Sequence, residues 1–208
     1  MKNLKGKILC YTQNDNLVLS IAKEGRRVRV ISGCARGRRI IAPKGTKIRP
    51  TSDRVKEAIF NTIASLVMQS DFLDLFAGSG SIGIEALSRG ANSCTFVDNS
   101  PQAIKCIKNN LSNVGFEDRS VVILGDSTKI ITKFTKTYDI IFLDPPYGCD
   151  LVVPIMKNLK LLLKEEGIIV VETENKIELP SQCDDFRILK TSKYGDTQIG
   201  YYNYKGGN

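Results

Sequence analysis

The sequence contains one segment whose residues could hold the exocyclic amine of a nucleobase. It is Asp144-Pro145-Pro146-Tyr147, directly after the apolar run 140–143. Such an amine is a weak nucleophile because its lone pair is delocalised into the ring. The Asp144 carboxylate and the Pro145 carbonyl could each accept one N–H and aim the lone pair at a methyl donor. The prolines stiffen the turn, and Tyr147 could stack on a base that has left its own stack. The segment therefore predicts amine methylation without a covalent intermediate.

A glycine-rich segment upstream could bind the cofactor. Gly78, Gly80 and Gly83 satisfy G-x-G-x-x-G, and Asp98 follows Gly78 by 20 residues, at the end of the next predicted strand. This spacing fits NAD or S-adenosylmethionine, because both carry a ribose diol that a carboxylate can bind. Asp74, four residues before the first glycine, favours S-adenosylmethionine, since its carboxylate can face the amino-acid part of that cofactor.

A further carboxylate follows the third predicted strand, in Gly125-Asp126-Ser127. Asp126 could accept a hydrogen bond from an adenine amino group at the ligand-binding edge of the sheet, although Gly-Asp is also ordinary turn chemistry. The expected cofactor-binding residues are therefore Asp74, Phe76, Ala77, Gly78, Ser79, Gly80, Asp98, Asn99, Asp126 and Ser127.

Metal chemistry and histidine chemistry are not expected. The chain has no histidine, and its six cysteines contain no C-x-x-C pair. The commonest transition-metal ligand is thus absent, together with the usual general base and the usual activator of a nucleophile.

An alternation of apolar runs and helical patterns must position these residues. The expected strands are 72–76, 94–97, 121–124, 140–143 and 168–171, and the expected helices are 81–89, 101–114 and 151–163. Short continuous apolar runs are typical of parallel strands that are covered on both faces. The segments 186–190 and 198–204 leave no room for a crossover helix, so they must pair antiparallel. We expect a Rossmann-like class I methyltransferase fold of the α/β class, with a mostly parallel seven-stranded sheet ending in an antiparallel hairpin.

Positive charge is concentrated at the start of the chain. Residues 1–56 contain 15 Lys or Arg and three acids, and the remainder contains 15 and 19, so a net charge of +12 is followed by −4. A block this basic favours binding to a polyanion, although a solvated face that aids solubility would look similar. Segment 29–41 predicts a basic hairpin, and a helix is expected over 53–67 after Pro50-Thr51-Ser52.

We expect three parts along the chain: an N-terminal extension at 1–28, a basic hairpin appendage at 29–52 and a methyltransferase domain at 53–208. No apolar run reaches the roughly 18 residues needed to span a bilayer, and the N-terminus lacks the sustained apolar stretch of a signal peptide. A cytoplasmic protein with no membrane partner is therefore expected. We also expect a monomer.

The sequence resembles the bacterial small-subunit ribosomal RNA guanine-N2 methyltransferases of the RsmD type. The resemblance covers residues 29–204 and is carried by the segments 29–33, 49–57, 74–83, 85–90, 144–147 and 194–197. It implies methyl transfer from S-adenosylmethionine to one guanine of 16S rRNA in a nearly assembled small subunit. The implied target is the guanine equivalent to position 966.

The resemblance also implies roles for single residues. Residues 144–147 would hold the base, while Gly78, Gly80, Asp98 and Asp126 would hold the cofactor. Proteins of this family usually begin near Arg29, so the segment 1–28 has no counterpart and is expected to be dispensable. The expected RNA contacts, most of them to phosphates, are Arg36, Arg38, Arg39, Lys44, Lys47, Arg49, Thr51 and Arg54.

Three other functions fit part of the sequence. An adenine-N6 methyltransferase acting on DNA could use Asp144 to Tyr147 by the same physics, but the chain has little room for a target-recognition domain. A nicotinamide-dependent oxidoreductase would explain G-x-G-x-x-G with Asp98, but neither the segment 144–147 nor the basic block. An RNA-binding assembly factor without catalysis would not need Asp144 and Tyr147.

Overall fold

The structure is a computed structural model that describes residues 27–43, 51–146 and 149–205. Several residues named above lie outside this part: Lys44, Lys47, Arg49, Tyr147 and nearly all of the 1–28 extension. Within the described part, no helix combines the length and the apolar character that a membrane crossing requires.

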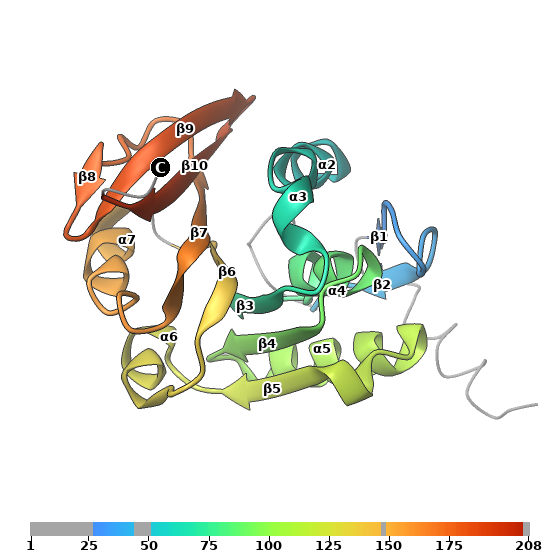
Figure 1. Ribbon diagram of the computed structural model, residues 1–208. Coiled ribbons are helices and arrows are strands. Elements are labelled where there is room, and N and C mark those ends of the chain that lie inside the picture. The colour runs from blue at the N-terminus through green and yellow to red at the C-terminus, as the bar shows by residue number, and fades with distance from the viewer. Residues whose placement is uncertain (1–26, 44–50, 147–148, 206–208) are drawn as a thin grey trace, which may run out of the picture.

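The centre of the molecule is one eight-stranded sheet in the order β5-β4-β3-β6-β7-β10-β9-β8 (Figure 1). The parallel strands are β3 Asp71–Leu75, β4 Ser93–Asp98, β5 Ser120–Leu124, β6 Tyr138–Leu143 and β7 Leu163–Glu174. The antiparallel strands are β10 Thr197–Tyr204, β9 Phe186–Tyr194 and β8 Gln182–Cys183. The predicted Rossmann-like methyltransferase architecture is confirmed. The eighth strand has only two residues, too few to give a pattern in the sequence.

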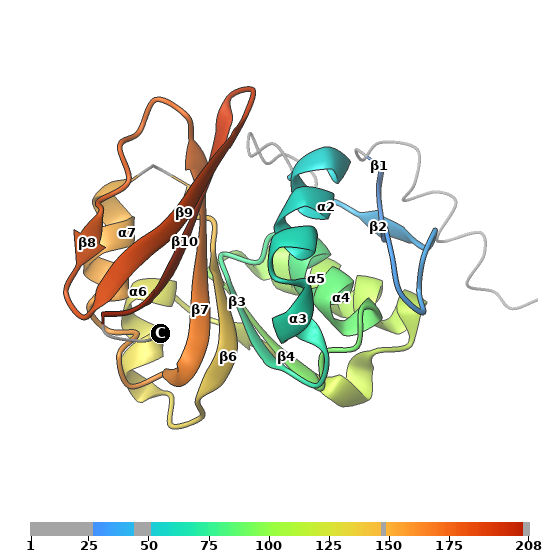
Figure 2. The ribbon, with the colours of Figure 1, turned by 45° about the horizontal axis from the view of Figure 1, so that its top comes forward.

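Helices cover both faces of this sheet (Figure 2). On one face lie α2 Asp53–Thr62, α3 Ala64–Val67, α4 Ser81–Ser88 and α5 Pro101–Val114, and on the other lie α6 Ser127–Ile130 and α7 Cys149–Met156. Two short 3-10 helices, Glu117–Arg119 and Ile131–Lys133, follow α5 and α6.

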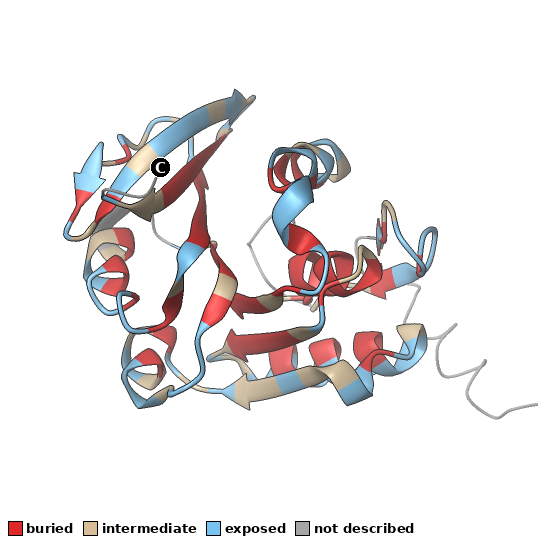
Figure 3. Ribbon diagram, in the orientation of Figure 1, coloured by how far each residue is buried: buried red, intermediate tan, exposed pale blue. Residues whose placement is uncertain are grey.

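Strand alternation explains this two-sided core, because successive side chains point to opposite faces. Phe72 and Phe142 pack under α2 and α4, whereas Leu73 and Leu143 pack under α7. The inner strands β3 and β4 are buried, and the edge strand β5 is half-buried or exposed (Figure 3).

Local signals set both ends of α5 where the sequence predicted them. The Ser100 hydroxyl accepts a hydrogen bond from the Ala103 N–H, and Pro101 occupies the first turn of α5. Gly115 ends that helix in the left-handed conformation, at φ 76°.

Two predicted helices differ from the observed ones. The predicted helix over 53–67 is interrupted at Ile63, whose φ of −101° and ψ of 15° separate α2 from α3. The predicted helix over 151–163 ends at Met156. Leu159 and Leu162 are buried in the turns that follow, so their apolar spacing imitates a continuing helix.

The basic hairpin packs firmly against α4. Its strands β1 Arg27–Arg29 and β2 Arg39–Ile41 pair antiparallel as predicted. Glu85 of α4 accepts hydrogen bonds from the backbone N–H groups of Ile31 at 2.7 Å and Ser32 at 2.9 Å. The hairpin thus satisfies its backbone donors with a helix side chain rather than with a third strand.

A buried lysine completes this contact. The Lys56 ammonium donates to the Arg29 carbonyl at 2.7 Å and lies 3.7 Å from the Glu85 carboxylate, with both side chains fully buried. Burial lowers the pKa of Lys56, and the Glu85 charge opposes that shift. Removing one partner of such a pair is costly because it leaves an uncompensated charge in the interior.

The glycine of the segment 29–33 permits the close approach of the hairpin to α4. Gly33 has φ +84°, and a Cβ atom there would lie 1.8 Å from the Ser88 carbonyl oxygen. Gly37, in the same turn, has φ +83°, but a Cβ there would meet nothing within 4 Å. An alanine would therefore be in a similarly strained backbone conformation at either position, but only at Gly33 would its methyl group also clash.

This difference gives a matched pair of variants. Gly37→Ala should lower the free energy of unfolding by about 1–2 kcal/mol, from left-handed strain alone. Gly33→Ala should lower it by a further 1–3 kcal/mol or so, because the methyl group also pushes the hairpin away from α4. Urea unfolding of both variants measures the difference, and equal losses would contradict the proposed close contact.

Candidate active site

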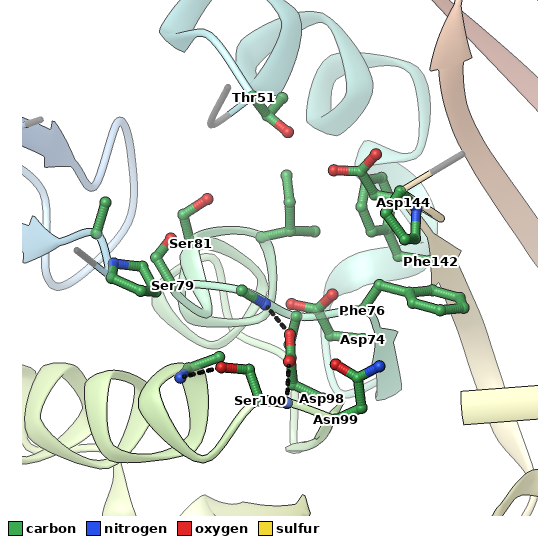
Figure 4. A pocket seen from close by; sticks show the side chains of 17 residues that line it. Thr51, Asp74, Phe76, Ser79, Ser81, Asp98, Asn99, Ser100, Phe142 and Asp144 are labelled. Atoms are coloured by element: carbon green, nitrogen blue, oxygen red, sulfur yellow. Dashed lines mark hydrogen bonds between the residues drawn. The ribbon is translucent and has the colours of Figure 1, made fainter. Parts of the chain in front are cut away.

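A pocket opens at the carboxyl edge of the parallel strands, where the sequence predicted the site (Figure 4). The predicted residues that line it are Asp74, Phe76, Ala77, Gly78, Ser79, Asp98, Asn99, Asp144 and Pro146. Thr51 also lines it, together with Ala42 and Pro43 of the appendage. The structure therefore brings seven of the ten predicted cofactor residues and the start of the predicted base-binding segment into one cavity.

The glycine-rich loop forms the floor of the pocket between β3 and α4. Phe76 has φ 65°, a left-handed conformation that is uncommon for a residue with a side chain and is typical of functional turns. Gly83 lies inside α4, and a Cβ there would come within 2.3 Å of the Phe96 ring. The third glycine of G-x-G-x-x-G thus allows α4 to pack on β4.

Asp98 fixes this loop from the end of β4. Its carboxylate accepts the Gly78 N–H and the Ser100 N–H, each at 2.8 Å (Figure 4). A carboxylate has about four acceptor sites, so Asp98 keeps lone pairs for a ribose hydroxyl while it orients the loop.

Three carboxylates meet on one face of the sheet. The register pairs Leu75 with Leu143 and Leu143 with Val171. The residues that follow Leu143 and Val171, Asp144 and Glu172, are therefore neighbours. Asp74 points to the same face by strand alternation.

Burial makes these groups hard to ionise in the free protein. It raises the pKa of Asp74 to about 8 and that of Asp144 to about 7. The pKa of Glu172 is well above its usual value, first because of burial and then because of the Asp144 charge. Bound positive charge or N–H donors would stabilise the ionised forms of all three groups.

Glu172 is a residue of this cluster that was not predicted from the sequence. This residue is 7% exposed and accepts a hydrogen bond from the Thr51 hydroxyl at 2.7 Å. It comes directly after the apolar run 168–171, as Asp98 and Asp144 come after theirs, so the same signal could have found it. Thr51, expected at the RNA surface, is instead 8% exposed within the pocket.

The pocket has two ends. Asp98, Asn99 and Ser100 lie together at one end, whereas Thr51 and Asp144 lie at the other, with their oxygen atoms facing the space between them (Figure 4). Pro145 is buried after Asp144 and does not line the pocket, and Tyr147 lies outside the described residues. The roles of these two residues in holding a base stay predictions.

Three predicted cofactor residues lie off the pocket wall. Gly80 is buried and precedes α4. Asp126 is exposed and accepts hydrogen bonds from the Thr128 N–H and hydroxyl, which lower its pKa. Ser127 is buried, and its hydroxyl has no hydrogen-bond partner among the described residues. Asp126 is thus the N-cap of α6, and its predicted contact with adenine stays a prediction.

The described basic candidates lie outside the pocket. Arg36, Arg38 and Arg39 are exposed on the hairpin, and Arg54 is exposed on α2. These positions suit phosphate contacts, and their RNA contacts stay predictions.

The comparisons with known proteins agree with this architecture. A family model described as Conserved hypothetical protein 95 matches residues 28–203. A candidate rRNA methyltransferase of Bacillus subtilis is 39% identical over 184 residues, covering 86% of this chain and 100% of that protein. Ribosomal RNA small subunit methyltransferase D of Haemophilus influenzae is 37% identical, covering 84% and 93%. A solved structure of a candidate methyltransferase from Escherichia coli superposes with a TM-score of 0.75 at 28% identity, covering 87% and 99%.

The Thr51–Glu172 hydrogen bond can be tested by a matched pair of substitutions. Thr51→Val removes the donor and leaves a buried carboxyl group unsatisfied, which should lower the free energy of unfolding by about 1–3 kcal/mol. Thr51→Ser retains the hydroxyl and should lose clearly less. Chemical denaturation measures both, and a valine variant as stable as the serine variant would contradict the bond.

The raised pKa of Asp144 predicts a pH-dependent gain in stability on Asp144→Asn. The folded pKa of about 7 lies above the value of about 3.9 expected in the unfolded chain. Below the unfolded pKa, Asp144 is protonated in both states and does not lower the free energy of unfolding. As the pH rises from the unfolded pKa to the folded pKa, the unfolded chain releases this proton more readily, so the free energy of unfolding falls. Scanning calorimetry should show a higher Tm for the asparagine variant at pH 8 and nearly equal Tm values at pH 4. An equal difference at both pH values would contradict a buried, ionisable Asp144.

Proposed function

The chain belongs to the RsmD-type family of ribosomal RNA methyltransferases, and from this premise we propose that it methylates the N2 amine of a guanine in 16S rRNA. The proposed site is the equivalent of position 966. The proposal includes S-adenosylmethionine as the methyl donor. The observation that carries it is the placement of Asp144 at one end of a pocket whose other end contains Asp98 and the glycine-rich loop.

The residues of the pocket fit this cofactor. Asp98 has spare acceptor sites for the ribose hydroxyls, and Asp74 lies between Asp98 and Asp144 (Figure 4). S-adenosylmethionine carries a sulfonium and an ammonium, so it would stabilise carboxylates whose pKa burial has raised. This charge match supports a cationic cofactor for the pocket.

The chemistry proposed for the chain is positioning and proton removal. S-adenosylmethionine, when bound, supplies an electrophilic methyl carbon. The Asp144 carboxylate accepts one N–H of the guanine amine and so turns the nitrogen lone pair toward that carbon. It then accepts the proton that the methylated amine loses, as a general base whose pKa burial raises above the ordinary value of an aspartate.

The RNA would reach the pocket from the side of the appendage. Arg36, Arg38, Arg39 and Arg54 are exposed on the hairpin and on α2, and Ala42 and Pro43 extend the appendage to the pocket wall. The substrate would be the small ribosomal subunit or its assembly intermediate, bound by a cytoplasmic monomer.

The substrate proposal is tested in cells that lack the protein. Mass spectrometry of their 16S rRNA nucleosides should show the loss of one N2-methylguanosine, restored by the wild-type chain. An unchanged nucleoside profile would remove the substrate proposal. Methyl-transfer assays on ribosomal subunits, naked RNA and DNA separate it from the adenine-N6 alternative, which requires methyl incorporation into DNA.

Asp144→Ala should lower kcat by about 100-fold while binding of S-adenosylhomocysteine persists. Asp118→Ala, at an exposed position of the 3-10 helix after α5, is the matched control and should leave kcat unchanged. The measurement is methyl transfer to unmodified small subunits at saturating cofactor. An unchanged kcat in Asp144→Ala would contradict the role proposed for Asp144, whereas a wild-type chain that transfers no methyl group would favour an assembly factor without catalysis.

A further inference from the structure

We propose that Asn110 is a positioning residue that sets the affinity of the pocket for its cofactor, by holding the appendage and the glycine-rich loop at one fixed spacing. The inference rests on the proposed function, because it takes the ligand of the pocket to be S-adenosylmethionine. It adds a residue of α5 that does not line the pocket.

The side chain of Asn110 is fully buried and joins two segments that are distant in sequence. Its Oδ1 accepts the Ile41 N–H at 2.9 Å, and its Nδ2 donates to the Ile41 carbonyl at 2.8 Å. The same Nδ2 donates to the Ser79 carbonyl at 2.9 Å. One amide group thus pairs with the last residue of β2 as a neighbouring strand would, and it also holds the glycine-rich loop.

Both segments continue directly into the pocket wall. Ile41 is followed by Ala42 and Pro43, which line the pocket, and Ser79 lines it as well. Figure 4 shows Ser79 on the wall across the pocket from Asp144. A shift of Ile41 relative to Ser79 would therefore change the width of the cavity on the side that lies opposite the reacting base.

The appendage does not depend on Asn110 for its attachment. The Cys106 thiol donates to the same Ile41 carbonyl at 2.9 Å. At the other end of the appendage, Glu85 holds Ile31 and Ser32, and the Ser88 hydroxyl accepts the Ala35 N–H at 3.0 Å. Loss of the Asn110 side chain should consequently loosen the spacing of the wall without releasing the hairpin.

The chain offers a control that separates this role from general stability. Ser88→Ala removes two hydrogen bonds of the appendage, to Ala35 and to Ser32, but none to the glycine-rich loop. Asn110→Ala and Ser88→Ala should both lower the Tm, whereas only the Asn110 variant should weaken cofactor binding.

The test is calorimetric titration of the full chain with S-adenosylhomocysteine. Asn110→Ala should raise the Kd by about tenfold, and Ser88→Ala should change it by less than about twofold. In methyl-transfer assays, the KM for S-adenosylmethionine should rise in the Asn110 variant while kcat at saturating cofactor stays unchanged. Asn110→Asp is a second variant: it retains the acceptor for Ile41 but loses both donors, and it should weaken binding as well.

The outcomes separate the two proposals. A wild-type chain that binds no S-adenosylhomocysteine overturns the proposed function and this inference with it. A wild-type chain that binds the ligand, with Asn110 variants that bind it equally tightly, overturns the inference alone. Equal weakening by Ser88→Ala also overturns it, because the effect would then follow from loosening of the appendage in general.

Discussion

The cost of burying carboxylates at the end of a parallel sheet governs the organisation of this protein. Asp74, Asp144 and Glu172 lie on one face of three adjacent strands, and burial raises the pKa of each. Among the described residues few partners offset this cost: Asp74 accepts the Gly83 N–H at 3.0 Å, and Glu172 accepts the Thr51 hydroxyl. Buried charges that lack full compensation are expensive. We interpret these three carboxylates as part of a binding site for a ligand that carries positive charge and N–H donors.

The rest of the fold holds these carboxylates in register. The regular pairing of β6 with β3 and β7 over residues 140–143 fixes the positions of these carboxylates along the strands. The two hydrophobic clusters on either side of the sheet prevent the strands from slipping. The basic hairpin joins the same core through Val28, Val30 and Ile40. Its attachment to α4 through Glu85 and Lys56 uses directional hydrogen bonds between buried groups, an arrangement that favours one orientation more than it adds stability.

The sequence predicted those features that local patterns encode. Asp98 and Asp144 could be found because each carboxylate ends an apolar strand, and α5 because Ser100 and Gly115 mark its two ends. Asn110 escaped notice because its role depends on contacts with Ile41 and Ser79, in distant segments, that leave no periodic trace. Glu172 ends an apolar run as Asp144 does, so the sequence could have indicated this residue but not its hydrogen bond with Thr51. The end of α7 was mistaken because buried leucines in a turn imitate helical spacing. The hairpin was expected as an appendage, yet Ala42 and Pro43 contribute to the pocket wall, which only the folded chain reveals.

The G-x-G-x-x-G segment alone does not discriminate between cofactors, and the structure gives the physical reason. Gly83 serves the packing of α4 on Phe96, and the Gly78 N–H is occupied by Asp98, so both features suit any ligand with a ribose. The discrimination lies in the charge of the surroundings. The pyrophosphate of a dinucleotide would bring two negative charges close to Asp74, Asp144 and Glu172. Burial already makes these groups hard to ionise, and a bound anion would oppose their ionisation further. A sulfonium with an ammonium group is attracted by the same three residues. The carboxylates that make the free pocket costly therefore favour a cationic methyl donor over a nicotinamide cofactor.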